Sequence, residues 1–351
     1  MPGHVPLNEQ EEKMKSYGWS NYVICQAILG IFAMALILNA CESGKQDDQH
    51  NTPEMSDFPD FITPAGDYFV LSIGNKPDLD GEDYRLEISG TLGEPASFSL
   101  EALRKLDMVE QTVTIECIEN PPNGNLLSTA TWKGFRVYDL LAELGIPEDV
   151  AFVKYLCADG YFTYNTLEEL QNRNVMGALD MNGAPIPVKY GFPLRIIFPG
   201  YYGVRQPGWV VGIQLIKSGI KDFWGETQFE KWHTDSSMTI DSKIFFPADD
   251  ETVPMGENLR IGGAAYGSKR VARVEITTDD GQTWIQAEKV VQMDQDYVWV
   301  FWEADYTPQS TGSLTIRARA TAGNGRVQSR DDNNYLDGTS AWPFVTVNVV
   351  K

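Results

Sequence analysis

Cys117 is the residue of this chain that its type and neighbours best place to do chemistry. It ends a run of alternating apolar residues, 113–117 (VTIEC), and the nearby segment 120–125 (NPPNGN) favours neither helix nor strand. This arrangement predicts a thiol at the end of a sheet strand, held on a stiff loop. A thiol in such a place can serve as a metal ligand or as a nucleophile.

Two structural roles are open for the same side chain. Free cysteines are among the most buried residue types, so Cys117 can also be a core residue. It can also form a disulfide with Cys157 in an oxidising compartment, because these two are the only thiols beyond residue 41. The sequence has no C-x-x-C, C-x-x-C-H or H-E-x-x-H motif, which argues against zinc ribbons, thioredoxin-type pairs and c-type haem.

The densest group of candidate ligand-binding residues lies in segment 190–209 (YGFPLRIIFPGYYGVRQPGW). Gly200 and Gly203 would let backbone amides approach a ligand closely. Arg195 and Arg205 supply guanidinium groups that suit a phosphate. A Gly-Pro hairpin with ordinary surface arginines would have the same composition and is the alternative.

The elements that must position these residues change in character along the chain. Residues 58–238 mix strands and short helices in an irregular order, which predicts an α+β domain rather than a doubly wound one. In residues 239–351 short alternating strands recur, and residues 279–281 (DDG) predict a tight hairpin. This second pattern is typical of an immunoglobulin-like β-sandwich.

Residues 1–41 are expected to be a targeting segment. The largely apolar residues 22–40 are just numerous enough to span a bilayer. Residues 38–41 (LNAC) are similar to the site at which bacterial lipoproteins are cleaved and acylated. We therefore expect Cys41 to be lipidated, with an uncleaved helical anchor as the alternative.

The sequence around that segment adds two expectations. Residues 1–12 are acidic, which is unusual at the start of a targeting segment, so we expect the true start at Met14. Residues 42–57 are polar and have little to bury, which predicts a flexible tether. The folded part is thus expected in the bacterial cell envelope, anchored to the membrane and facing the periplasm or the exterior.

Three separated motifs resemble the sulfite oxidase family of molybdopterin-dependent oxidoreductases. The first is segment 114–120 (TIECIEN) followed by 132–141 (WKGFRVYDLL), and the second is segment 181–209. The third consists of 274–284 (VEITTDDGQTW) and 314–324 (LTIRARATAGN) in the expected sandwich. The resemblance implies a molybdopterin-binding domain followed by an immunoglobulin-like domain that helps to form a homodimer where the family dimerises.

The resemblance also implies a molybdenum–molybdopterin cofactor, with Cys117 as the catalytic residue and metal ligand. A soft thiolate is a fitting ligand for such a metal, which would support two-electron oxo transfer with a small-molecule substrate. Electrons would pass through a partner such as a cytochrome or a quinone-linked membrane protein, since the sequence has no haem or iron–sulfur motif. The implied cofactor-binding residues are Asn120, Tyr190, Arg195, Gly200, Gly203, Arg205 and Trp209.

The substrate side departs from the sulfite-oxidising members of the family. Leu71 stands in place of their Arg, Phe223 in place of a Tyr, Tyr190 in place of a His and Gly208 in place of a Lys. These changes remove charge and hydrogen bonding that a doubly charged substrate needs, so a sulfoxide-type substrate is expected rather than sulfite. The expected substrate-pocket residues are Tyr202, Phe223 and Trp224.

The net charge of −21 argues against binding to nucleic acid. A second class of function remains open beside the enzyme. In that alternative the chain is a non-catalytic interaction module of the envelope that uses its sandwich for assembly and lacks the cofactor.

Overall fold

The computed structural model describes residues 57–74, 76–226, 237–331, 338 and 341–351. Contacts divide the chain into two units, Met1–Met55 with Ser72–Asn75 and Ser56–Leu71 with Lys76–Lys351, and the second unit holds every named strand and helix. Cys41 and the expected targeting segment lie outside the described residues. Over the described ranges, no helix is long and apolar enough to cross a membrane.

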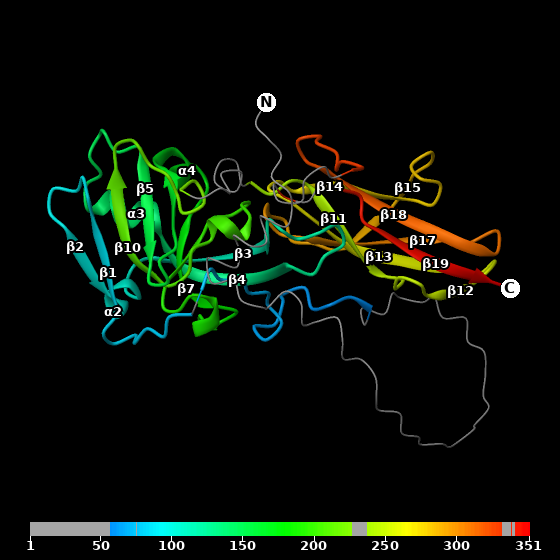
Figure 1. The fold of residues 1–351 in the computed structure, drawn as a ribbon, viewed down its shortest axis with the longest axis horizontal. Helices are drawn as coiled ribbons and strands as arrows, with labels where there is room; N and C mark the ends of the chain where they lie inside the picture. The colour runs from blue at the N-terminus through cyan, green and yellow to red at the C-terminus, as the bar shows by residue number, and fades with distance from the viewer. Residues whose placement is uncertain (1–56, 75, 227–236, 332–337, 339–340) are drawn as a thin grey trace, which may run out of the picture. The chain divides into compact units, whose positions relative to one another are not determined.

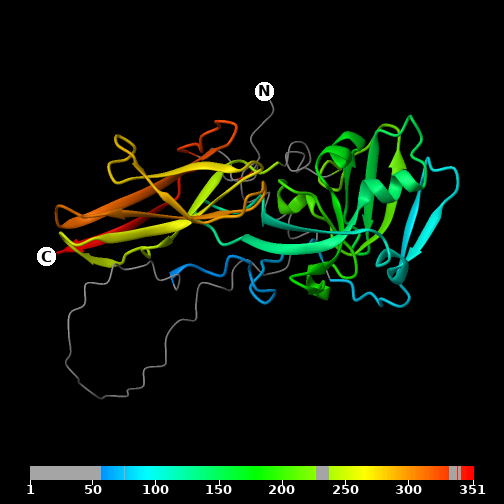
Figure 2. The same ribbon diagram turned by 180° about the vertical axis from the view of Figure 1, so that it is seen from behind.

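The first sheet of the α+β part has the strand order β2-β1-β10-β5-β6 (Figure 1). Strand β1 runs parallel to β10, and the other neighbours are antiparallel. Leu86 and Ile88 of β1 belong to the same buried core as Leu140 and Leu141 of helix α3, which lies over this sheet in the view from behind (Figure 2). The strands are β1 (Arg85–Gly90), β2 (Ala96–Ser99), β5 (Phe152–Cys157), β6 (Phe162–Thr166) and β10 (Val210–Ile216).

The second sheet contains the hairpin that carries Cys117. Strands β3 and β4 pair antiparallel from Met108 opposite Phe135 to Glu116 opposite Leu127. The turn between them, residues 117–126, is called the Cys117 turn below. The strands of this sheet are β3 (Met108–Glu116), β4 (Leu127–Arg136), β7 (Met176–Met181), β8 (Ala184–Pro185) and β9 (Arg195–Ile197).

Short helices connect these strands. Helix α4 begins with a capping box, in which the Thr166 side chain accepts from Glu169 N and the Glu169 side chain accepts from Thr166 N. Helix α2 has only four residues. The helices are α2 (Leu100–Leu103), α3 (Val137–Glu143) and α4 (Leu167–Asn172), with single 3-10 turns η2 (Val188–Tyr190) and η3 (Gly203–Arg205).

The C-terminal part is a sandwich of two sheets around a core that includes Trp302, Ile316 and Val347. The α+β part followed by this all-β sandwich confirms the predicted fold class. One sheet has the order β11 (Asp241–Phe246), β13 (Leu259–Tyr266), β17 (Val300–Tyr306), β16 (Glu288–Val291). The other has the order β12 (Thr252–Pro254), β19 (Phe344–Val350), β18 (Gly312–Ala322), β14 (Val271–Thr277), β15 (Ile285–Gln286).

The described chain begins with a segment that packs onto the sandwich and the hairpin. The Phe58 ring stacks on Phe301 at 5.2 Å between centroids. The indole of Trp299 donates to Phe61 O at 2.9 Å, and Thr63 N donates to Thr129 O of β4 at 2.8 Å. This first segment is therefore fixed by residues that are far away in the sequence.

A candidate cofactor site around Cys117

Cys117 is the first residue after β3, as the strand pattern predicts. Its backbone N–H donates to Leu126 O at 2.9 Å, and its carbonyl accepts from Asn120 N at 3.0 Å. The side chain is only 7% exposed, and this burial raises the pKa of the Cys117 thiol to about 12. Such a thiol is protonated and unreactive near neutral pH, whereas a bound metal cation would stabilise the thiolate. Burial thus favours the ligand role over the nucleophile role.

The second cysteine of the folded part does not pair with the first. Cys117 and Cys157 are both buried free thiols. Cys157 ends β5, where burial raises its pKa well above the ordinary value. The structure therefore does not contain the disulfide that the sequence left open.

Glu116, the residue before Cys117, is a buried carboxylate that the sequence interpretation missed. Its Oε1 accepts from Asn120 Nδ2 at 2.8 Å and from the Tyr266 hydroxyl at 2.9 Å. Burial raises the pKa of Glu116 to about 8. Asn120 Oδ1 in turn accepts from Leu126 N at 2.9 Å. Asn120, expected to bind the cofactor, thus uses both ends of its side-chain amide to close the turn from inside.

Arg195 lies in a group of buried donors. Its Nη1 donates to Tyr190 O at 3.0 Å, and its guanidinium lies 5.5 Å from the centre of the Trp132 ring. Among the described residues, no partner reaches three buried groups in this region, Arg195 Nε, Trp132 Nε1 and the Tyr68 hydroxyl. Tyr68 packs edge-on against Trp132 at 5.9 Å between centroids. Clustered buried donors without acceptors suit an anionic ligand such as a phosphate.

Arg205 lies on the single turn η3 and is 4% exposed. Its Nη2 donates to Tyr164 O at 2.5 Å and lies 3.8 Å from Glu169 Oε2. The Glu169 carboxylate partly compensates the buried charge, which leaves less of it for a ligand. Its Nε has no acceptor in the part of the chain that the structure describes, so this atom remains able to bind an anion.

The structure brings segment 190–209, called the arginine segment because it carries Arg195 and Arg205, next to the Cys117 turn. A Cβ at Gly203 would lie 3.5 Å from Glu116 O and 3.7 Å from the Phe69 ring, so η3 lies beside the end of β3. Gly200 has φ +81°, and a Cβ there would lie 2.7 Å from the Tyr297 ring. Packing against Tyr297 therefore requires glycine at position 200 whether or not a ligand binds.

Two other expected cofactor contacts are already engaged within the protein. The Tyr190 hydroxyl lies within hydrogen-bond distance of two carbonyl oxygens, Ala65 O at 2.6 Å and Tyr68 O at 2.7 Å. The Trp209 indole donates to Val188 O at 2.9 Å, and Trp209 has a left-handed φ of +51°. Both side chains hold segments of the site in place.

The expected substrate-pocket residues fall into two groups. Tyr202 is buried, with its hydroxyl 3.1 Å from Thr239 Oγ1. Phe223 and Trp224 pack against each other at 5.1 Å and against Tyr161 at 5.5 and 6.5 Å between centroids. The Tyr161 hydroxyl donates to Val204 O, which connects the second group to η3.

The donor set of this region fits the cofactor that the resemblance implies. Cys117 would hold the metal through sulfur, and Arg195 and Arg205 would offer buried N–H donors to its phosphate end. The carboxylate of Glu116 and the hydroxyl of Tyr266 could not have been assigned to this site from local sequence, because they are 150 residues apart.

Comparisons with known proteins agree with this arrangement. Residues 73–224 match the family described as "Oxidoreductase molybdopterin binding domain", and residues 233–351 match "Mo-co oxidoreductase dimerisation domain". Mitochondrial sulfite oxidase of Homo sapiens is 30% identical over 314 residues, which covers 76% of this chain and 57% of that protein. Nitrate reductase [NADH] 1 of Oryza sativa subsp. japonica is 26% identical, with coverage of 83% and 38%.

A solved structure shares the fold. The sulfane dehydrogenase SoxCD of Paracoccus pantotrophus superposes with a TM-score of 0.73 at 21% identity, covering 84% of this chain and 85% of that one. The chain spans little more than half the length of the mammalian sulfite oxidases that it matches. The two matched domains together include the Cys117 turn, the arginine segment and the whole sandwich. The chain belongs to the sulfite oxidase family of molybdopterin-dependent oxidoreductases.

Proposed function

We propose that this chain is an extracytoplasmic oxidoreductase that performs two-electron oxo transfer on a small sulfur-containing substrate of the sulfoxide type. The observation that carries the proposal is the buried thiol of Cys117 at a strand end, next to a segment whose two arginines have buried N–H groups that no acceptor among the described residues reaches. When bound, the cofactor would supply the redox chemistry and the exchangeable oxo group.

The residues of the chain have binding and positioning roles in this proposal. Burial of Cys117 keeps water from the sulfur, and the high pKa of its thiol means that a proton must leave when the metal binds. Arg195 and Arg205 would orient the phosphate end through their Nε–H groups. Asn120 and Glu116 keep the Cys117 turn closed.

Two residues support a substrate of low charge. Leu71 is 50% exposed and apolar, and Phe223 lies in an aromatic cluster and has no hydroxyl. Neither can offer a charged or hydroxyl hydrogen bond to a doubly charged anion. In the proposed reaction a sulfoxide takes up two electrons and two protons to give a thioether and water. The electrons would come from a redox partner such as a cytochrome or a quinone-linked membrane protein.

The proposal extends to location and assembly. Leu38 to Cys41, which lies outside the described residues, is similar to a lipoprotein cleavage site, so we place the enzyme on the membrane of the bacterial envelope through acylated Cys41. The match of residues 233–351 to a dimerisation domain supports a homodimer.

Metal analysis of the purified protein tests the central part of this proposal. We expect about one molybdenum and one pterin per chain, in line with a cofactor enzyme. Sulfoxide reduction with a reduced dye and sulfite oxidation with an artificial acceptor are then compared on the loaded protein. Protein that folds and purifies without molybdenum, even from cells that make the cofactor, would favour the non-catalytic envelope module.

A further inference from the structure

We propose that Lys243 and Tyr266, two side chains of the β-sandwich, are positioning residues for the Cys117 turn. This inference rests on the proposed role of Cys117 as the metal ligand. The two residues lie on neighbouring strands, β11 and β13, which are paired in one sheet. Each contacts a different part of the turn or the residue before it, so the sandwich holds the turn at two separate points.

Lys243 holds the outer half of the turn. Its Nζ donates to Asn123 O at 2.9 Å, to Gly124 O and to Asn125 Oδ1 at 2.7 Å. An ammonium group has three N–H donors, so all of them are used on this one loop. Lys243 is only 9% exposed, and its burial lowers its pKa to about 8. The buried ammonium group of Lys243 therefore directs all of its hydrogen bonds to this one turn.

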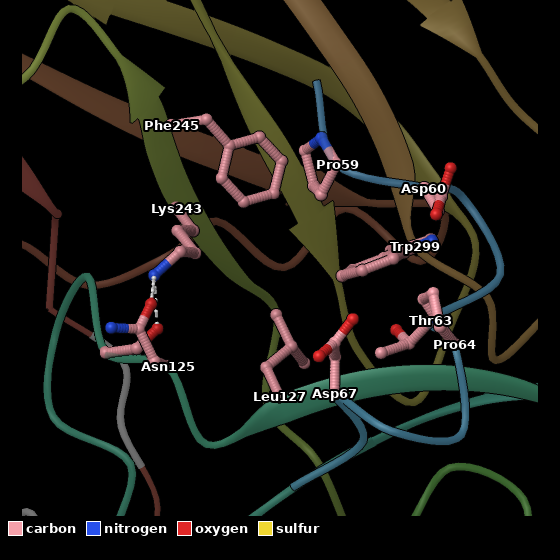
Figure 3. A pocket seen from close by; sticks show the side chains of 11 residues that line it. Pro59, Asp60, Thr63, Pro64, Asp67, Asn125, Leu127, Lys243, Phe245 and Trp299 are labelled. Carbon is pink, nitrogen blue, oxygen red and sulfur yellow. Dashed lines mark hydrogen bonds between the residues drawn. The ribbon is translucent and has the colours of Figure 1, made fainter. Parts of the chain in front are cut away.

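A further hydrogen bond from β11 to the turn lies next to the Lys243 contacts. Ile244 N, the next residue of β11, donates to Asn123 Oδ1 at 2.8 Å. Figure 3 shows Lys243 reaching toward Asn125 at one side of a crevice of about 370 Å³. Gly124, Asn125 and Lys243 all line this crevice, so solvent reaches the turn from that side. The bonds from β11 therefore hold a part of the turn that is open to water.

Tyr266 holds the inner half of the turn. Its hydroxyl donates to Glu116 Oε1, the same oxygen that accepts from Asn120 Nδ2. Asn120 is bonded to Leu126 N through its other side-chain atom. The path from Tyr266 thus runs through Glu116 and Asn120 to the far end of the turn. All three side chains are buried, which makes their directions well defined.

The turn needs this external support because it has little regular structure of its own. Its internal backbone bonds are few and include Asn120 N to Cys117 O at 3.0 Å and Gly124 N to Pro121 O at 2.7 Å. A Cβ at Gly124 would lie 2.2 Å from Asn120 Oδ1, so the turn is tightly closed. Loss of a contact that orients a ligand commonly weakens metal binding by about 10–100-fold.

The first test is Lys243→Met, with Lys289→Met as the matched control. Lys289 is a half-buried lysine of the same sandwich, but its Nζ donates to Val271 O, within the sandwich. Hydrogen–deuterium exchange of the purified holoenzyme is followed in peptides that cover residues 117–126. We expect exchange there to accelerate at least about tenfold in Lys243→Met and to stay at the wild-type rate in Lys289→Met. Unchanged exchange in Lys243→Met overturns the proposal.

A milder variant on the turn guards against general unfolding. Asn125→Ala removes one of the three acceptors of Lys243 from an exposed residue. We expect a smaller acceleration in the same peptides, and no further acceleration when Asn125→Ala is added to Lys243→Met. Additive effects of the two substitutions would show that Lys243 and Asn125 act separately. That result would overturn the proposal that Lys243 holds the turn through Asn125.

Tyr266→Phe tests the inner contact by spectroscopy. Removing the hydroxyl leaves the ring in place, so we expect a shifted Mo(V) electron paramagnetic resonance signal and about 10–100-fold faster loss of molybdenum. An unshifted signal and unchanged retention would remove Tyr266 from the proposal. A wild-type protein without molybdenum, or a Cys117→Ser variant that retains the wild-type signal, would instead contradict the proposed function. The exchange measurement would still decide whether Lys243 holds the Cys117 turn.

Discussion

At Cys117 burial and metal ligation act on the thiol proton in opposite directions. Burial raises the pKa to about 12, so the thiol is neutral when no cation is near. A cation bound at the sulfur would reverse this preference, and the released proton would make metal binding stronger at higher pH. Burial thus keeps the unligated thiol protonated and inert, and a bound metal would have to displace its proton.

Cys117→Ser should therefore abolish the molybdenum redox signal and turnover and leave the fold intact. Serine is nearly the same size as cysteine, and its hydroxyl is a poor ligand for a soft site. We expect loss of the Mo(V) signal and of turnover, with a melting temperature within a few degrees of wild type. Cys157→Ser serves as the control and should keep both signal and turnover. Equal unfolding of the two variants would speak for a purely structural role of both thiols.

Arg195→Lys should lower cofactor content although it keeps the positive charge. Lysine lacks the planar set of donors that reaches Tyr190 O and leaves Nε–H for a phosphate. We expect about 10–100-fold weaker retention of the pterin, measured by fluorescence after oxidation and release. Arg104→Lys changes an exposed ion pair with Asp180 and should have no effect. Equal retention in both variants would place the phosphate elsewhere.

The substrate prediction depends on Leu71 and Phe223. Each missing charged or hydroxyl hydrogen bond costs about 1.5–3 kcal/mol, so two of them would slow sulfite oxidation roughly a hundredfold or more. We expect slow sulfite oxidation beside ordinary sulfoxide reduction in the loaded enzyme. Leu71→Arg with Phe223→Tyr should raise the sulfite rate. Fast sulfite turnover by the unaltered enzyme would show that other residues provide the anion pocket.

The turn of the hairpin between β14 and β15 is stabilised by hydrogen bonds to the carboxylate of Asp279. Asp279 Oδ1 accepts from Thr277 Oγ1 at 2.7 Å and from Thr283 N at 2.9 Å, and Oδ2 accepts from Thr283 Oγ1 at 2.6 Å. The bond from the Thr283 hydroxyl, followed by the others, lowers the pKa of Asp279 from 3.8 to about 2. The unfolded chain therefore binds this proton more readily than the folded one between these pH values.

Asp279→Asn should destabilise the protein at neutral pH and lose this effect in acid. A lowered folded pKa contributes stability that is complete above pH 3.8 and disappears as the pH falls through about 2. We expect the urea midpoints of wild type and variant to differ at neutral pH and to converge toward pH 2. Glu288→Gln, on an exposed residue of β16, gives the control curve. A difference that does not depend on pH would contradict the prediction.

Helix α2 shows where sequence periodicity stops being informative. Leu100, Leu103 and Leu106 have helical spacing, and all three pack on the same core. The chain nevertheless leaves the α-helix after Leu103, because Lys105 N and Leu106 N donate to residues three positions earlier, Ala102 and Leu103. Tight turns place residues three apart on one side as well as a helix does. The core contact was therefore predictable, and the length of the helix was not.

The residues of the candidate site likewise fall into those that local sequence could predict and those that it could not. Cys117, Arg195 and Arg205 could be found because each lies in a distinctive local sequence. Tyr266 and Lys243 could not, because their contacts with the turn cross 150 and about 120 residues of chain. Tyr266 is the last residue of β13, and only the folded structure brings its hydroxyl to Glu116.

For the whole molecule, lipidation at Cys41 gives a direct test of location. Labelled fatty acid should enter the wild-type protein in bacteria and should not enter Cys41→Ala. The several chains of a mature lipoprotein give stable anchoring, so the variant should be released from the membrane fraction. Membrane-bound, unlabelled wild-type protein that keeps its first residues would favour the uncleaved helical anchor.

The packing of the first described segment also bears on the order in which the molecule can be built. Phe58 stacks on Phe301, and Phe61 is bonded to Trp299, 238 residues later. A ribosome makes chains from the N-terminus, so this segment must wait until most of the protein has been synthesised before it finds its place. The earliest part of the folded chain is thus among the last to be completed, and a nascent chain cut short before β17 would leave it without its partner surface.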